Sequence, residues 1–174
     1  MIGAILATDM SEHFSKFGQF KGKVLDPDFD AMTNENKKMI FEMVFHLCDI
    51  SNATKPFEIC QKWTDLLFIE FFNQGDLEKQ KGLNISMFMD RKTTNIASSQ
   101  IGFIDFIIKP SFEVTSMLLP QLYRFNEGVE NNKKQWETRK AEYEPSRKNY
   151  SNKRLSIRSD YVNGNKSTIL DQNN

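Results

Sequence analysis

The sequence has few of the residues on which most metal and disulfide sites depend: 174 residues contain two cysteines and two histidines. Cys48 and Cys60 lack the spacing of a zinc or redox motif and lie among apolar residues, so we expect reduced, buried thiols. His13 and His46 also lie beside apolar residues, which favours hydrogen-bonded core imidazoles over metal ligands. A zinc ribbon and a disulfide framework are therefore excluded.

Long hydrophobic runs and an excess of charge are also lacking. No apolar run reaches the roughly 18 residues of a membrane-spanning helix. Residues 1–7 are apolar, but they have no basic start and run into Thr8 and Asp9, which disfavours a signal peptide. The 23 basic and 23 acidic residues cancel, so the net charge provides no general attraction to nucleic acid. We expect a cytoplasmic protein with no membrane span and no nucleic-acid partner.

Charge is nevertheless distributed unevenly along the chain. Residues 131–174 contain ten Lys or Arg and five Asp or Glu, together with many Asn and Ser and few large apolar groups. Such a composition cannot bury enough apolar surface to fold. We therefore place a domain at residues 1–136 and a polar, basic, disordered tail at residues 137–174. The tail could contact acidic surfaces, but a solvated tail is the simpler interpretation.

The spacing of apolar residues predicts an all-α fold, because three-and-four spacing recurs and sustained alternation of period two is lacking. Asn73, Gln74 and Gly75 are expected to end a long helix, and Pro110 to end a later one. The expected helices cover residues 2–23, 33–49, 56–73, 76–81, 93–108 and 112–119, followed by an amphipathic helix that reaches Trp136.

Two side chains in the run 98–108 could address a flat ligand together. Gln100 and Phe103 lie one helical turn apart, so an amide and an aromatic ring share a face. An amide can hydrogen-bond the edge of a purine, and a ring can stack on its face for about 1–3 kcal/mol. Alternatively, a neighbouring backbone group satisfies Gln100, and Phe103 packs in the core.

Asp49 ends an apolar helix directly before Ser51 and Asn52, where a carboxylate and an amide could point into a cleft. An Asp at the end of a helix is, however, more commonly a turn former. The sequence contains no spacing typical of a nucleophile triad, a phosphate-binding glycine loop or a zinc ribbon. Motifs alone therefore indicate a helical protein with a possible cleft.

The sequence contains, in this order, the blocks ATDMSEHF at 7–14, HLCDISNATKP at 46–56, WT at 63–64, EFFNQGD at 70–76, DRK at 90–92 and SQIGFIDF at 99–106. Taken together and in this order, these blocks resemble the class I 3′,5′-cyclic nucleotide phosphodiesterases. The stretch 90–94 and the glutamine helix after it are most similar to the calmodulin-stimulated branch, although no calmodulin-binding region is present.

The resemblance implies a base pocket built from five residues. Gln100 corresponds to the residue that hydrogen-bonds the purine edge. Phe103 and Leu67 correspond to the two jaws that clamp the base, and Phe71 lines the same pocket. Asn52 corresponds to a polar contact near the base and ribose, and this position leans slightly towards adenine. A choice between cAMP and cGMP does not follow from these residues.

The resemblance also implies a two-metal centre that contains zinc and magnesium. Asp49 corresponds to a carboxylate ligand of the zinc, and Met10 lines the metal side of the cleft. The family uses two histidines and two aspartates as ligands and a further histidine as general acid, and most of these precede the first block, upstream of this chain. We expect no catalytic residue here, one metal ligand, and a protein partner that covers the missing N-terminal half.

Two functions follow as expectations. The first is hydrolysis of 3′,5′-cyclic nucleotides, cAMP or cGMP, to 5′-nucleoside monophosphates, with this chain forming the C-terminal part of the catalytic domain and inactive alone. The alternative is a catalytically dead helical interaction subunit of a larger assembly.

Overall fold

The computed structural model describes residues 2–140, so the predicted tail lies, from residue 141 on, outside the described residues. The described chain contains helices and no strand, which confirms the all-α prediction. The elements are α1 (Ile2–Leu6), η1 (Met10–Glu12), α2 (His13–Val24), α3 (Asn34–Asp49), η2 (Ser51–Thr54), α4 (Phe57–Gln80), α5 (Ile96–Phe103), η3 (Ile104–Ile108), α6 (Lys109–Leu118), η4 (Pro120–Tyr123) and α7 (Arg124–Arg139).

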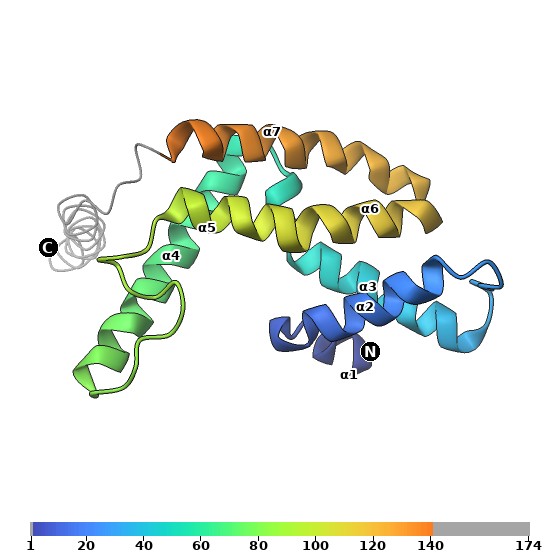
Figure 1. Ribbon diagram of the computed structural model, residues 1–174, viewed down its shortest axis with the longest axis horizontal. Helices are drawn as coiled ribbons and strands as arrows, with labels where there is room; N and C mark the ends of the chain where they lie inside the picture. Colours follow the sequence, from blue (N-terminus) through green and yellow to red (C-terminus); the bar gives the residue numbers. More distant parts are fainter. Residues whose placement is uncertain (1, 141–174) are drawn as a thin grey trace, which may run out of the picture.

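A rod formed by α5, η3 and α6 organises the molecule (Figure 1). Helix α7 returns beside the rod and contacts α5, η3 and α6. Helices α2 and α3 pack against α6, and α4 contacts α7 and η2. None of the described helices is long and apolar enough to cross a bilayer.

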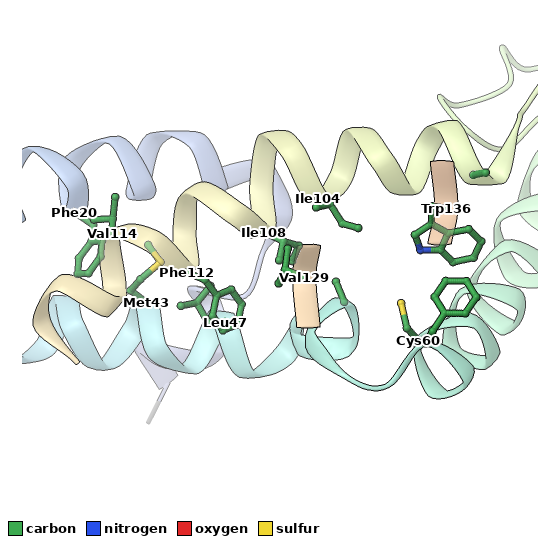
Figure 2. Packing of buried hydrophobic residues seen from close by; sticks show 13 residues of the cluster. Phe20, Met43, Leu47, Cys60, Ile104, Ile108, Phe112, Val114, Val129 and Trp136 are labelled. Atoms are coloured by element: carbon green, nitrogen blue, oxygen red, sulfur yellow. The ribbon is translucent and has the colours of Figure 1, made fainter. Parts of the chain in front are cut away.

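The main core lies along this rod (Figure 2). Ile104 and Ile108 of η3 and Trp136 of α7 are fully buried, and the Trp136 and Phe57 rings meet edge to face at 5.1 Å. Burial of one such side chain stabilises the fold by about 1.5–3 kcal/mol. The remaining buried members of the cluster are Phe20, Met43, Leu47, Ala53, Cys60, Ala97, Phe112, Val114 and Val129.

The predicted single helix over residues 2–23 is wrong, because the chain turns between α1 and η1. The hydroxyl of Thr8 donates to the Ile5 carbonyl at 2.8 Å, and a carboxylate oxygen of Asp9 accepts from the Ser11 backbone N–H at 2.9 Å. Short polar side chains of this kind satisfy backbone groups locally and compete with a continuous helix.

The predicted helix end at Asn73, Gln74 and Gly75 is also wrong, because α4 continues to Gln80. Gly75 instead permits a close approach of the following loop, since a Cβ atom added there would lie 2.0 Å from the Met89 carbonyl oxygen. Gly75 therefore makes room for the loop that contains Met89, and it does not interrupt α4.

The predicted helix end at Pro110 is wrong, because Pro110 lies in the first turn of α6. The segment before it, η3, is π-helical, and the Lys109 N–H bonds to the Ile104 carbonyl. A proline ring clashes with the preceding turn of a regular α-helix. The wider π-turn directly before Pro110 accommodates that ring.

The cysteine prediction holds for one residue only. Both thiols are free, but Cys60 is buried whereas Cys48 is exposed. Cys48 lies on the outer face of α3, while the neighbouring His46 and Leu47 face inward and are buried. The two histidines are buried imidazoles, as predicted, and bond to each other at 2.9 Å between His13 Nδ1 and His46 Nε2.

Candidate functional site

Gln100 and Phe103 lie one turn apart on α5 beside helix α4. The Gln100 side chain is buried, and its Oε1 accepts a hydrogen bond of 3.3 Å from the hydroxyl of Thr64 on α4. No group in the described part of the chain accepts a bond from its Nε2. Phe103 is half-buried and packs against the main core.

Thr64 is the residue of this site to which the sequence assigned no role. It is fully buried and lies 36 residues before Gln100. The only signal in the sequence is its helical spacing from Leu67 and Phe71, which places all three side chains on one face of α4. The Thr64 to Gln100 bond therefore joins the predicted members of the base pocket on the two helices.

Leu67 and Phe71 form the α4 part of the predicted pocket. Leu67 is 38% exposed, and the half-buried Phe71 ring meets the Phe68 ring edge to face at 5.7 Å. Phe68 and Ile96 belong to a second apolar cluster. Since Ile96 is the first residue of α5, this cluster holds α4 against the start of the glutamine helix.

Asp49 and Asn52 lie together where α3 passes into η2. Asp49 is the last residue of α3 and is exposed, while Asn52 lies on η2 and is half-buried. The turn is closed by a bond of 3.1 Å from the Lys55 N–H to the Asn52 carbonyl. It is also closed by a bond of 2.8 Å from the Thr54 hydroxyl to the Ser51 carbonyl.

Met10 lies on η1 and is 40% exposed. His13, the first residue of α2 directly after η1, bonds to His46 of α3, and Asp49 follows His46 by less than one turn. Burial is the main cause that lowers the pKa of His13. It is also the main cause that lowers the pKa of His46. The histidine pair therefore favours its neutral form.

A pocket of about 150 Å³ borders the histidine pair, and the sequence did not predict it. Its lining combines two imidazoles with one cationic, one anionic and one amide side chain, and it also includes two methionines and an alanine. The lining residues are Ala7, His13, Lys16, Gln19, Met39, Glu42, Met43 and His46.

The described residues do not supply a metal centre by themselves. Among them, no group of three or more His, Cys, Asp or Glu side chains is arranged to hold a metal ion. Zinc sites in proteins use three or four protein ligands, whereas Asp49 is the single ligand that the sequence predicted. The donor set present in residues 2–140 therefore does not fit the implied zinc and magnesium.

Comparison with protein-family models decides the family. The model described as 3′5′-cyclic nucleotide phosphodiesterase matches residues 1–129. The chain belongs to this phosphodiesterase family. The match covers every residue that the sequence predicted for the site.

Similar curated proteins support the assignment. The human high affinity cGMP-specific 3′,5′-cyclic phosphodiesterase 9A is 40% identical over 122 residues, which are 70% of this chain and 20% of that protein. The dual specificity calcium/calmodulin-dependent 3′,5′-cyclic nucleotide phosphodiesterase 1 of Drosophila melanogaster is also 40% identical, over 68% of this chain and 14% of that protein. Equal identities to both support the predicted closeness to the calmodulin-stimulated branch only weakly.

A solved structure shares the fold. The structure of LmjPDEB1 in complex with IBMX superposes with a TM-score of 0.73 at 32% identity, and the match covers 79% of this chain and 41% of that one. The chain thus spans about a fifth of the human relative's length and less than half of the solved phosphodiesterase.

Proposed function

We propose that this chain forms the base-binding part of a 3′,5′-cyclic nucleotide phosphodiesterase, which hydrolyses cAMP or cGMP to the 5′-nucleoside monophosphate. The observation that carries the proposal is the Thr64 to Gln100 hydrogen bond. It anchors the amide between α4 and α5, inside the stretch that matches the phosphodiesterase model.

The side chains around that amide suit a nucleobase. Gln100 retains two N–H donors on Nε2 and a second lone pair on Oε1 for the polar edge of a purine. Phe103 on α5 contributes a ring that can stack on the base, worth about 1–3 kcal/mol. Leu67 and Phe71 contribute the apolar wall on α4, and Asn52 a polar contact towards the ribose.

Asp49 and Met10 form the part of the proposal that concerns metal ions. Asp49 would be one carboxylate ligand, and Met10 would line the same end of the cleft. Zinc and magnesium would take their remaining ligands from outside the described residues, because one carboxylate does not hold zinc. We therefore expect the purified chain to show no hydrolysis of its own when both metals are added.

A second candidate function is a helical interaction subunit without activity. It is favoured by large apolar side chains that the described chain leaves in solvent, such as Leu6 and Phe14, each 64% exposed, and Trp63, 61% exposed. A contiguous patch of such side chains would mark an interaction site. A partner that covers it would be needed for either function, and a catalytic partner would also bring the remaining metal ligands.

The proposal includes the cytoplasmic location expected from the sequence. Its support is that Cys48 and Cys60 are both free thiols, which is common in the reducing cytoplasm.

A domain exchange tests the function. The 122 residues that match in the human relative are replaced by the corresponding residues of this chain, and hydrolysis of cGMP and cAMP is measured. We expect an active chimera whose ratio of the two rates reports the base preference of this pocket. Gln100→Ala in the chimera should raise KM for both nucleotides, because the polar contact to the base is lost.

Two results would contradict the proposal or its alternative. A folded chimera without hydrolysis, beside an active unmodified relative, would rule out the phosphodiesterase function and favour the interaction subunit. Measurable hydrolysis by the isolated chain with zinc and magnesium would instead contradict the expected inactivity and the alternative of a subunit without activity.

A further inference from the structure

Asn132 is a fully buried amide in the middle of α7. Its Nδ2 donates to the Ala53 carbonyl at 2.7 Å and to the Lys55 carbonyl at 2.8 Å. An amide nitrogen has two hydrogens, so both are used on this turn. The reverse orientation would direct Oδ1 at two carbonyl oxygens, which fixes the direction of the side chain.

The two carbonyls belong to Ala53 of η2 and to Lys55, the C-cap of η2, and the same turn contains Asn52. A second contact seats α7 on this turn: a Cβ atom added at Gly128 would lie 2.6 Å from the Thr54 carbonyl oxygen. Gly128 lies one helical turn before Asn132. The backbone of α7 therefore approaches η2 closely at Gly128 and bonds to it at Asn132.

The Oδ1 atom of Asn132 is buried and has no hydrogen-bond partner among the described residues. Its Nδ2 atom nevertheless satisfies two backbone carbonyls, and an apolar side chain of similar volume would leave both carbonyls without this donor. Asn132 therefore fixes the turn before α4 through its side-chain nitrogen.

The same helix also holds the element that contains Gln100. The side-chain Nδ2 of Asn95, the N-cap of α5, donates to the Lys140 carbonyl at 3.2 Å. Lys133, the neighbour of Asn132, pairs with Asp105 of η3 at 2.8 Å. Helix α7 therefore contacts η2, which contains Asn52, and α5, which contains Gln100. These two elements are separated in sequence by α4 and its following loop.

We propose that Asn132 is a positioning residue for the cyclic nucleotide: it holds η2 so that Asn52 faces the base pocket formed by α4 and α5. This inference rests on the proposed function, since it assigns a support to that same pocket. Asn132 touches no nucleotide and acts through the carbonyls of Ala53 and Lys55.

The test uses the full chain labelled with nitrogen-15 and titrated with cAMP and with cGMP. The side-chain amide signals of Asn52 and Gln100 report the two halves of the pocket separately. In Asn132→Leu we expect the Gln100 response to remain, the Asn52 response to disappear and the affinity to fall roughly tenfold, which corresponds to about one lost hydrogen bond.

Glu130→Gln is the matched control, because it breaks the ion pair of α7 with Lys109 and contacts neither η2 nor α5. It should leave both responses unchanged. Gly128→Ala is a second variant for the case that Asn132→Leu does not fold. Its added methyl group displaces Thr54, so it should also remove the Asn52 response selectively.

The outcomes separate the two proposals. A folded Asn132→Leu or Gly128→Ala chain that keeps both responses and the original affinity would overturn the positioning role and leave the proposed function intact. Failure of the unmodified chain to show any response at Gln100 would overturn the base-binding function, and the role of Asn132 with it.

Discussion

The hydroxyl of Thr64 on α4 donates a hydrogen bond of 3.3 Å to Oε1 of Gln100 on α5. Both side chains are buried, with 0% and 5% of their surface exposed. The bond directs the oxygen of the amide towards α4, which makes Nε2 the donor available to a ligand. An amide that is held in one orientation presents a fixed pattern of donors and acceptors to a purine.

Thr64→Val should therefore change base preference as well as stability. Valine has a similar shape but no hydroxyl, so a buried acceptor on Gln100 loses its partner, which costs about 1–3 kcal/mol of unfolding free energy. The released amide can rotate, and the ratio of cGMP to cAMP affinity should shift. Urea unfolding and titration calorimetry measure the two effects.

Thr115→Val is the matched control for this substitution. Thr115 is equally buried, but its hydroxyl donates to the Ser111 carbonyl of its own helix at 2.7 Å. It should leave the ratio of the two affinities unchanged. An equal shift of the ratio in both variants would show that the Thr64 bond does not orient Gln100.

Local sequence patterns predicted most helices because three-and-four spacing of apolar residues is a local property. They did not reveal Thr64 or Asn132, whose partners lie 36 residues away and 77 residues away or more. A threonine or asparagine in an amphipathic helix has no local mark that shows which distant group it will contact. Those partners exist only once the helices are packed.

Gly75→Ala should destabilise the protein although Gly75 lies within a helix. Alanine is the better helix former by about 1 kcal/mol, but its methyl group would meet the Met89 carbonyl 2.0 Å away. The loop around Met89 must then shift, so we expect a net loss of unfolding free energy. Gly18→Ala in α2 is the matched control, because the added methyl group would have no neighbour within 4 Å apart from the adjoining backbone of its own helix.

Chemical denaturation of both glycine variants separates helix propensity from the tertiary contact. Gly18→Ala should be neutral or stabilising by up to about 1 kcal/mol. Equal stabilisation in both variants would show that the loop does not approach α4 at Gly75.

Asn95 should support the glutamine helix in two ways that substitutions can separate. Its Oδ1 accepts from the Ser98 N–H at 2.9 Å, and its Nδ2 donates to the Lys140 carbonyl at 3.2 Å. Asn95→Asp keeps the capping oxygen and loses the donor, whereas Asn95→Ala loses both. The alanine variant should lose about 1 kcal/mol more unfolding free energy than the aspartate variant, the usual value of an N-cap.

Guanidinium unfolding followed by far-UV circular dichroism measures this difference. The two variants would be equally stable if the cap contributed nothing to α5.

The sequence placed Gln100 and Phe103 on one helix and Leu67 and Phe71 on another, and the structure joins these helices through Thr64. The resemblance supplied the roles, since neither spacing nor composition distinguishes a base-binding glutamine from a buried structural one. Pro110 shows the opposite limit. Its local preference against helix at Lys109 is overridden, since Lys109 has helical dihedral angles and η3 leads directly into α6.

The histidine pair should make stability dependent on pH. The pKa of His13 is lowered from 6.5 by burial and then by His46. Burial also lowers that of His46, Asp49 raises it and Lys16 lowers it, with a net lowering. The unfolded chain therefore binds more protons than the folded chain below pH 6.5. The stabilisation is complete above that pH and is lost as the pH falls through 6.5 towards the folded-state values.

These two histidines are the only ones in the sequence, so they dominate titration between about pH 7.5 and 5.5. We expect the free energy of unfolding, measured in urea, to fall across this range in the unmodified chain. In the double variant His13→Asn, His46→Gln it should be nearly constant, because neither replacement titrates. A slope that survives in the double variant would assign the pH dependence to other groups, and a rise in stability on acidification would contradict the neutral pair.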